Sequence, residues 1–166
     1  MTTLIITKEE PRGETVISPP TAPAEPVIKN TFFFPDIDPV KVRELMRLEQ
    51  TVPPARLRQA IKTAISETNA ELYDYRAQQM AAGFKSLAEV PSEVIDGERE
   101  KVALYLEAVM AMTTATLYEK YRGADASAKG DKKADSIDPT IDNLWRDMRW
   151  AVARLQDRPR CIVSQI

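Results

Sequence analysis

Residues 102–117 read Val-Ala-Leu-Tyr-Leu-Glu-Ala-Val-Met-Ala-Met-Thr-Thr-Ala-Thr-Leu, and Glu107 is the one charged side chain among them. A helix that is apolar nearly all round is buried on every side. The alanines and threonines in this stretch are small, so neighbouring helices can approach it closely. The sequence therefore predicts a central helix from about Glu98 to Arg122, with Gly123 as its stop.

Further helices are predicted on both sides of this central one. Two of them begin at an Asp-Pro pair, Asp38-Pro39 and Asp138-Pro139, in which an N-cap residue precedes a proline at the first helical position. The longest one carries an apolar stripe spaced by three and four residues and stops at Gly83. The four predicted helices cover approximately residues 38–50, 53–82, 98–122 and 138–156.

The connections between these helices are predicted to be irregular. Residues 84–97 contain Pro91 and the turn pair Asp96-Gly97, and residues 124–137 are small and charged. We expect no pair of β-strands. The predicted fold class is all-α, a small four-to-five-helix bundle with an extended N-terminal arm and an extended C-terminal tail.

The two ends differ from the helical part in composition. Seven of the twelve prolines lie within the first 39 residues, and proline fixes φ and removes a backbone donor. We divide the chain into a Pro-rich arm (1–37), a helical domain (38–157) and a C-terminal docking tail (158–166). Three consecutive phenylalanines end the arm, and an apolar run of this kind is expected to dock on the chain's own core or on a neighbour.

The composition argues against most catalytic sites. The 166 residues include no histidine and one cysteine, so the commonest general base and the commonest metal ligand are missing. We expect no enzyme activity, no metal site and no cofactor. The formal net charge is −2, which gives no strong attraction to nucleic acid or to an anionic membrane. No stretch is apolar enough to span a bilayer and no signal peptide is visible, so we expect assembly in the cytoplasm of the producing cell.

Three local features allow more than one interpretation. The loop 123–135 is interpreted as a solvated connection or as a loop that touches DNA or a neighbouring subunit. Trp150 lies about 140° round the helix from Trp145 and is either an interface anchor or part of a helix buried on two sides. The arginines between 146 and 160 alternate with aspartates, which favours a solvated, ion-paired face over a nucleic-acid stripe.

Two long strings of residues resemble a known family. The first is Val-Ile-Lys-Asn-Thr-Phe-Phe-Phe-Pro-Asp-Ile-Asp-Pro from Val27, followed by Arg-Leu-Glu-Gln-Thr-Val at 47–52. The second begins with Tyr-Arg-Gly-Ala-Asp-Ala-Ser-Ala-Lys at Tyr121 and continues through Leu-Trp-Arg-Asp-Met-Arg-Trp at 144–150 to Cys-Ile-Val-Ser-Gln-Ile at 161–166. Together they resemble the head completion/stabilisation protein family, GPL, of temperate contractile-tailed phages of enterobacteria.

The resemblance implies a structural role in the virion. Proteins of that family act after DNA has been packaged and cut, attach at the portal vertex, keep the genome inside and prepare the head for the tail. The implied partners are the portal protein, a tail-side connector or terminator protein, and neighbouring copies in a ring, which is expected to be dodecameric by analogy with related adaptors. Packaged DNA is expected to pass through without specific binding. The resemblance supplies no catalytic residue.

Three sets of residues are the hypothetical contact sites. The first set is expected to bind the portal and comprises Arg160, Cys161, Ile162, Val163 and Ile166. The second set is expected at the boundary between subunits and comprises Phe32, Phe33, Phe34 and Trp150. The third set is expected to face the lumen or the tail side and comprises Lys129, Lys132 and Lys133.

Two alternative functions remain open at this point. A DNA-binding packaging or regulatory factor would bind DNA with steep salt dependence. A carboxylate-dependent nuclease would need a specific pair among the 25 Asp and Glu residues, and no spacing singles one out.

Overall fold

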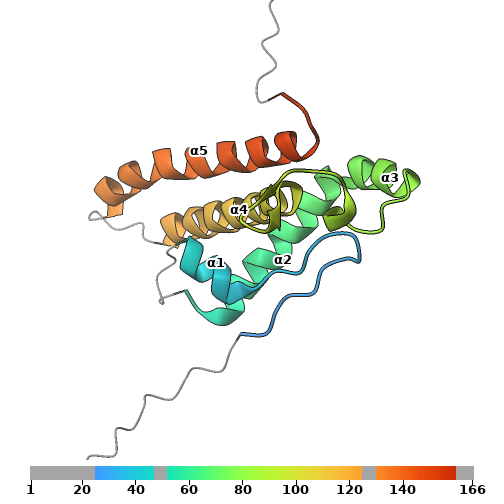
Figure 1. The fold of residues 1–166 in the computed structure, drawn as a ribbon. Helices are drawn as coiled ribbons and strands as arrows, with labels where there is room; N and C mark the ends of the chain where they lie inside the picture. Colours follow the sequence, from blue (N-terminus) through green and yellow to red (C-terminus); the bar gives the residue numbers. More distant parts are fainter. Residues whose placement is uncertain (1–24, 47–51, 125–129, 160–166) are drawn as a thin grey trace, which may run out of the picture.

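The fold is a bundle built on one central helix (Figure 1). The computed structural model describes residues 25–46, 52–124 and 130–159, and in 122–124 and 130–139 it describes the helical backbone alone. The elements are α1 (Pro39–Leu45), α2 (Pro54–Glu71), α3 (Tyr73–Ala81), the 3-10 helix η1 (Leu87–Glu89), β1 (Val94–Ile95), β2 (Glu98–Arg99), α4 (Glu100–Ala124) and α5 (Gly130–Leu155). The predicted all-α class is confirmed.

Helix α4 is the central element, as its apolar sequence predicts. It packs against α5 on one side and against α2 on the other (Figure 1). Tyr105, Ala108 and Val109 are fully buried in it. The buried hydroxyls of Thr113 and Thr114 donate to the carbonyls of Val109 and Met110, at 2.7 and 2.9 Å, which lets polar side chains lie in the core. The helix also includes Gly123, so the predicted stop there is wrong. A glycine in a last helical turn costs only about 1 kcal/mol relative to alanine.

The region predicted as one helix from 53 to 82 contains two. Helix α2 ends at Glu71, the following cap residue Leu72 has φ −92° and ψ 11°, and α3 begins at Tyr73. The backbone hydrogen bonds from Leu72 to Thr68 and from Arg76 to Leu72 persist across this bend. The predicted stop is confirmed, because Gly83 has φ +99° and Phe84 donates back to the Gln79 carbonyl at 3.1 Å.

A small antiparallel hairpin occupies part of the predicted irregular connection. Val94 pairs with Arg99 and Ile95 with Glu98. The two turn residues, Asp96 and Gly97, both have positive φ, 51° and 78°. The expectation of no strand pair was therefore wrong. An Asp-Gly pair is a strong signal for a two-residue hairpin turn as well as for a turn in an irregular connection.

Helix α5 begins earlier than predicted. It starts at Gly130, and Pro139 lies in its interior instead of at its first position. The predicted loop 124–137 is shortened accordingly, and residues 125–129 lie outside the described residues. The run before Pro139 contains Lys and Ala, which are good helix formers, so the helix can continue through that run.

Residues 25–37 fold back onto the bundle as a loop. Ile28 and Ile37 form an antiparallel bridge with backbone hydrogen bonds of 2.8 and 3.0 Å in both directions. Both isoleucines, with Phe33 and Phe34, belong to the same buried cluster as the helices. The carboxylate of Asp38 then accepts the Val40 N–H at 3.0 Å and caps α1, which confirms the predicted start. Helix α1 ends at Leu45, and residues 47–50 of the predicted helix lie outside the described residues.

Candidate assembly surfaces

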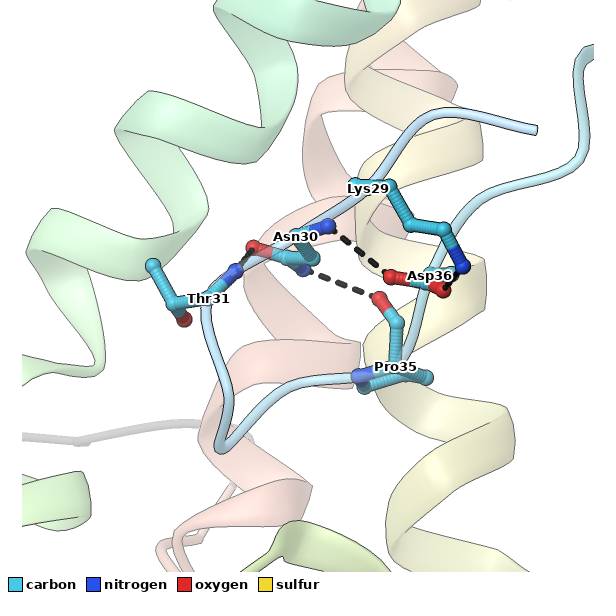
Figure 2. A network of polar contacts seen from close by, with 5 residues as sticks. All are labelled: Lys29, Asn30, Thr31, Pro35 and Asp36. Atoms are coloured by element: carbon cyan, nitrogen blue, oxygen red, sulfur yellow. Dashed lines mark hydrogen bonds and ion pairs between the residues drawn. The ribbon is translucent and has the colours of Figure 1, made fainter. Parts of the chain in front are cut away.

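The loop 25–37 is closed by hydrogen bonds around Asn30 (Figure 2). The Asn30 backbone N–H donates to the Asp36 carboxylate at 2.9 Å, and its side-chain amide donates to the Pro35 carbonyl at 2.9 Å. The Asn30 side-chain oxygen accepts the Thr31 N–H at 2.7 Å. The Lys29 ammonium lies 2.7 Å from Asp36, and this hydrogen bond together with that from Asn30 lowers the pKa of Asp36. The side chain of Asn30 therefore adds hydrogen bonds within the loop to the backbone pairing of Ile28 with Ile37.

The same asparagine ties the loop to the helices. Its amide donates to the Tyr105 hydroxyl at 2.8 Å, which donates to the Asn69 side-chain oxygen at 2.6 Å. The Asn69 amide donates back to the Asn30 side-chain oxygen at 2.9 Å. This closed triangle joins the loop, α2 and α4. Burial raises the pKa of the Tyr105 phenol far above its ordinary value, so the hydroxyl stays protonated and remains a donor.

The three phenylalanines lie in two different environments. Phe33 and Phe34 are buried in the chain's own core, where Phe34 stacks on Tyr105 with ring centroids 4.7 Å apart. The carbonyl of Phe33 accepts the Leu87 N–H at 2.8 Å, which fixes η1 against the loop. Phe32 is 72% exposed. Of the three, Phe32 is thus the one whose ring has surface for the predicted contact with a neighbouring subunit.

Trp150 lies half-buried on α5. The Arg146 guanidinium carbon lies 4.6 Å from its ring centroid. With Leu104 and Glu107 of α4 and Arg154 of α5, Trp150 lines a shallow open depression between the two helices. Trp145 joins the same two helices, because its indole N–H donates to Glu119 at 2.8 Å. The role of Trp150 at a subunit boundary stays a prediction.

Lys101 fixes the point from which the C-terminal tail leaves. Helix α5 ends at Leu155, and Asp157 just after it lies in the left-handed region with φ +56°. The backbone N–H of Arg158 donates to the Ala153 carbonyl at 2.8 Å, which closes the end of the helix. The ammonium of Lys101, a residue only 6% exposed, donates to the Leu155 carbonyl at 2.9 Å and to Asp157 at 2.7 Å.

The ammonium of Lys101 also lies 5.4 Å from the centroid of the Tyr75 ring. Burial alone would lower the pKa of Lys101, but its contacts with Asp157 and Tyr75 outweigh burial and raise that pKa. A charged lysine therefore holds the end of α5 against α4 and α3.

Sequence reasoning missed the Lys101 contact and the Asn30–Asn69–Tyr105 triangle. The one local signal for Lys101 was its position directly before an apolar stretch, where a lysine needs a partner if it is buried. The portal-binding set, residues 160–166, and Lys129 lie outside the described residues. Lys132 and Lys133 belong to helix α5, so the expectation that they belong to a loop is wrong.

The described residues contain neither a candidate metal site nor a membrane-spanning helix. No group of three or more His, Cys, Asp or Glu side chains could hold a metal ion in 25–46, 52–124 and 130–159. In those same ranges no helix is long and apolar enough to cross a membrane.

Comparison with known proteins gives two agreeing matches. A family model described as phage head completion protein (GPL) matches residues 28–166. The head completion/stabilization protein of Escherichia phage P2 is 71% identical over 168 aligned positions, which cover 100% of this chain and 99% of that protein. No solved structure matches the chain significantly.

Proposed function

Because the chain belongs to the phage head completion protein (GPL) family, we propose that it binds the portal vertex of the DNA-filled head, stabilises that head and prepares it for tail attachment. The structural role in the phage head is a property of the family. The observation that carries the proposal is the 71% identity, along the whole chain, to a head completion/stabilization protein. We place the protein in the virion, at the junction of head and tail, after assembly in the cytoplasm of the host.

The C-terminal tail is the proposed portal-binding element. Its residues Ile162, Val163 and Ile166 are apolar and alternate loosely, a pattern that can add a strand to an open sheet edge of a partner. The described structure supports this choice because Lys101 locks the residues immediately before the tail. A tail that starts from a fixed point loses less entropy when it docks than one attached to a frayed helix end.

The other partners follow from the same position in the virion. We propose that copies of the chain form a ring under the portal, dodecameric by analogy, and that its far side meets a tail-side connector or terminator protein. DNA passes through the ring without specific binding, which the net charge of −2 supports. Lys129, Lys132 and Lys133 are the proposed lumen-side or tail-side contacts.

Portal binding is tested by co-sedimentation of the purified chain with filled heads that lack it. The test variant replaces Ile162, Val163 and Ile166 together by serine, and the matched control replaces Ser164 and Gln165 by alanine. We expect the triple variant to bind at least tenfold more weakly, while the control binds like the parent chain. Equal binding of all three proteins would show that the portal contact lies elsewhere.

A further inference from the structure

The end of α5 carries an acid that its own helix does not favour. Asp157 follows the last helical residue by two positions and has φ +56°, a conformation in which glycine or asparagine is the usual residue. The C-terminal end of a helix also carries a partial negative charge, which repels a carboxylate. The Asp157 side chain is 77% exposed, so burial in the core does not explain its position. A cation from outside α5 is therefore expected beside it.

Lys101 supplies this cation, and its own helix does not favour it either. It is the second residue of α4, and the N-terminal end of a helix carries a partial positive charge. Lys101 is buried, and its ammonium donates to the Asp157 carboxylate at 2.7 Å and to the Leu155 carbonyl at 2.9 Å. Each charge thus lies at the unfavourable end of its own helix, and the two charges offset each other only as a pair.

A second ion pair joins the same two helices in the favourable sense. Glu100, the first residue of α4, lies 2.7 Å from Arg154 in the last turn of α5. Here the acid is at the N-terminal end of one helix and the base at the C-terminal end of the other. Both residues lie within the helices. The Lys101–Asp157 pair is different, because it also holds a residue that follows α5.

The Lys101–Asp157 pair ties the turn after α5 to the bundle. The backbone N–H groups of Asp157 and Arg158 donate back to carbonyls of the last helical turn at 2.9 and 2.8 Å. Pro159 follows, and its ring fixes φ. The Lys101 ammonium also lies 5.4 Å from the centroid of the Tyr75 ring of α3, which is at the same end of the bundle as the end of α5 (Figure 1). The direction of the chain at this turn is thus set relative to α4 and α3.

We infer that Lys101 and Asp157 are positioning residues for portal binding. Their ion pair sets the direction in which residues 160–166 leave the bundle, so that the tail meets the portal from a restricted set of orientations. Without the pair the tail starts from many orientations, and docking costs more entropy although no portal contact is lost. This inference rests on the proposed function, to whose tail it adds two residues that act without touching the portal.

Spin labels test the direction of the tail in the free chain. One label is attached to Cys161, the one cysteine of the sequence, and the other to Lys120→Cys, an exposed position on α4. The test variant Lys101→Met removes the ammonium and keeps the apolar stem, and the matched control Glu100→Gln removes the other ion pair. We expect Lys101→Met to broaden the distribution of distances between the labels about twofold, and Glu100→Gln to leave its width unchanged.

A third variant keeps the test decisive if Lys101→Met does not fold, which circular dichroism would show. Asp157→Asn changes an exposed side chain, and asparagine tolerates the left-handed backbone conformation, so the fold is retained. The neutral amide cannot form the ion pair. We expect this variant also to broaden the distance distribution.

Co-sedimentation with filled heads that lack the protein tests the effect on portal binding. We expect Lys101→Met and Asp157→Asn each to bind about three- to tenfold more weakly than the parent chain, and Glu100→Gln to bind like the parent. Adding Lys101→Met to the triple serine variant of the tail should cause no further loss, because a tail that does not dock gains nothing from its direction.

Three results would contradict the inference, and they are distinguishable. An unchanged distance distribution in both Lys101→Met and Asp157→Asn would show that the pair does not set the direction of the tail. Normal head binding by both variants, while the triple serine variant binds weakly, would show that this direction does not matter for docking. If the triple serine variant itself binds like the parent, the proposed tail contact fails, and with it the role of the two residues in portal binding.

Discussion

Phe32 and Phe33 are adjacent in sequence but lie in different environments. Folding stability and assembly can therefore be tested separately at these two positions. Phe33 is 1% exposed and Phe34 packs edge-on against it at 5.1 Å between ring centroids. Phe32, the preceding residue, has its ring largely in solvent. The sequence predicted that this run docks, but it could not tell which ring faces the chain's own core. That choice depends on the turn at 31–34, where the Phe34 N–H donates to the Thr31 carbonyl.

We predict opposite results for Phe33→Ala and Phe32→Ala. Removing the buried Phe33 ring leaves a cavity and should lower the free energy of unfolding by about 3–5 kcal/mol. The exposed Phe32 should change it by less than about 0.5 kcal/mol. Urea unfolding followed by tryptophan fluorescence measures both. If Phe32→Ala leaves stability and also incorporation into heads unchanged, its proposed role between subunits is wrong.

The buried Tyr105 hydroxyl predicts a loss of stability at alkaline pH. Its pKa in the folded chain is raised above the ordinary tyrosine value of about 10, so above pH 10 the unfolded chain loses this proton first. The unfolded state then binds fewer protons, and stability falls as pH rises, by up to about 1.4 kcal/mol per pH unit. The pKa values of Lys101 and Tyr75 are also raised, so these two groups add to the fall in stability as pH rises.

The variant Tyr105→Phe should reduce this alkaline slope. At neutral pH it should be less stable than the parent by about 1–3 kcal/mol, because the Asn69 oxygen and the Asn30 amide each lose a partner. Unfolding curves between pH 8 and 11 measure the slope. An unchanged slope would show that Tyr105 is not protected from solvent in the folded chain.

At the scale of elements, the sequence predicted those features that depend on local chemistry. The start of α1 at Asp38-Pro39 and the end of α3 shortly before Gly83 follow from the capping residues alone. The same Asp-Pro signal misled at 138–139, because the helix-forming residues before it allow α5 to begin earlier. The Asn30–Asn69–Tyr105 triangle depends on contacts between residues far apart in sequence, and no local pattern shows it.

The position of Pro139 gives a test of the start of α5. Inside a helix, proline lacks the N–H for a hydrogen bond and costs about 3 kcal/mol relative to alanine. We therefore predict that Pro139→Ala stabilises the chain by about 1–3 kcal/mol. Pro54, which lies at the first position of α2, is the matched control, and Pro54→Ala should be neutral or slightly destabilising. If Pro139→Ala behaves like Pro54→Ala, α5 begins at Pro139.

At the scale of the whole molecule, two sets of polar contacts fasten peripheral parts of the described structure to the bundle. The Asn30–Asn69–Tyr105 triangle fastens the loop 25–37 to the bundle at one place, and Lys101 fastens the end of α5 at another. Composition predicted a protein without the common catalytic groups, and the family resemblance predicted its place in the phage head.

The most direct test of the account uses a lysogen that carries this gene within an inducible prophage. The gene is deleted, the prophage is induced, and the genome-length DNA that survives nuclease treatment of the lysate is measured, with the parent gene on a plasmid as the control. We predict heads that package and cut DNA but lose it to nuclease and remain tailless, with recovery on complementation. Normal amounts of protected DNA in tailed particles would contradict a completion role at the portal and would favour the DNA-binding alternative.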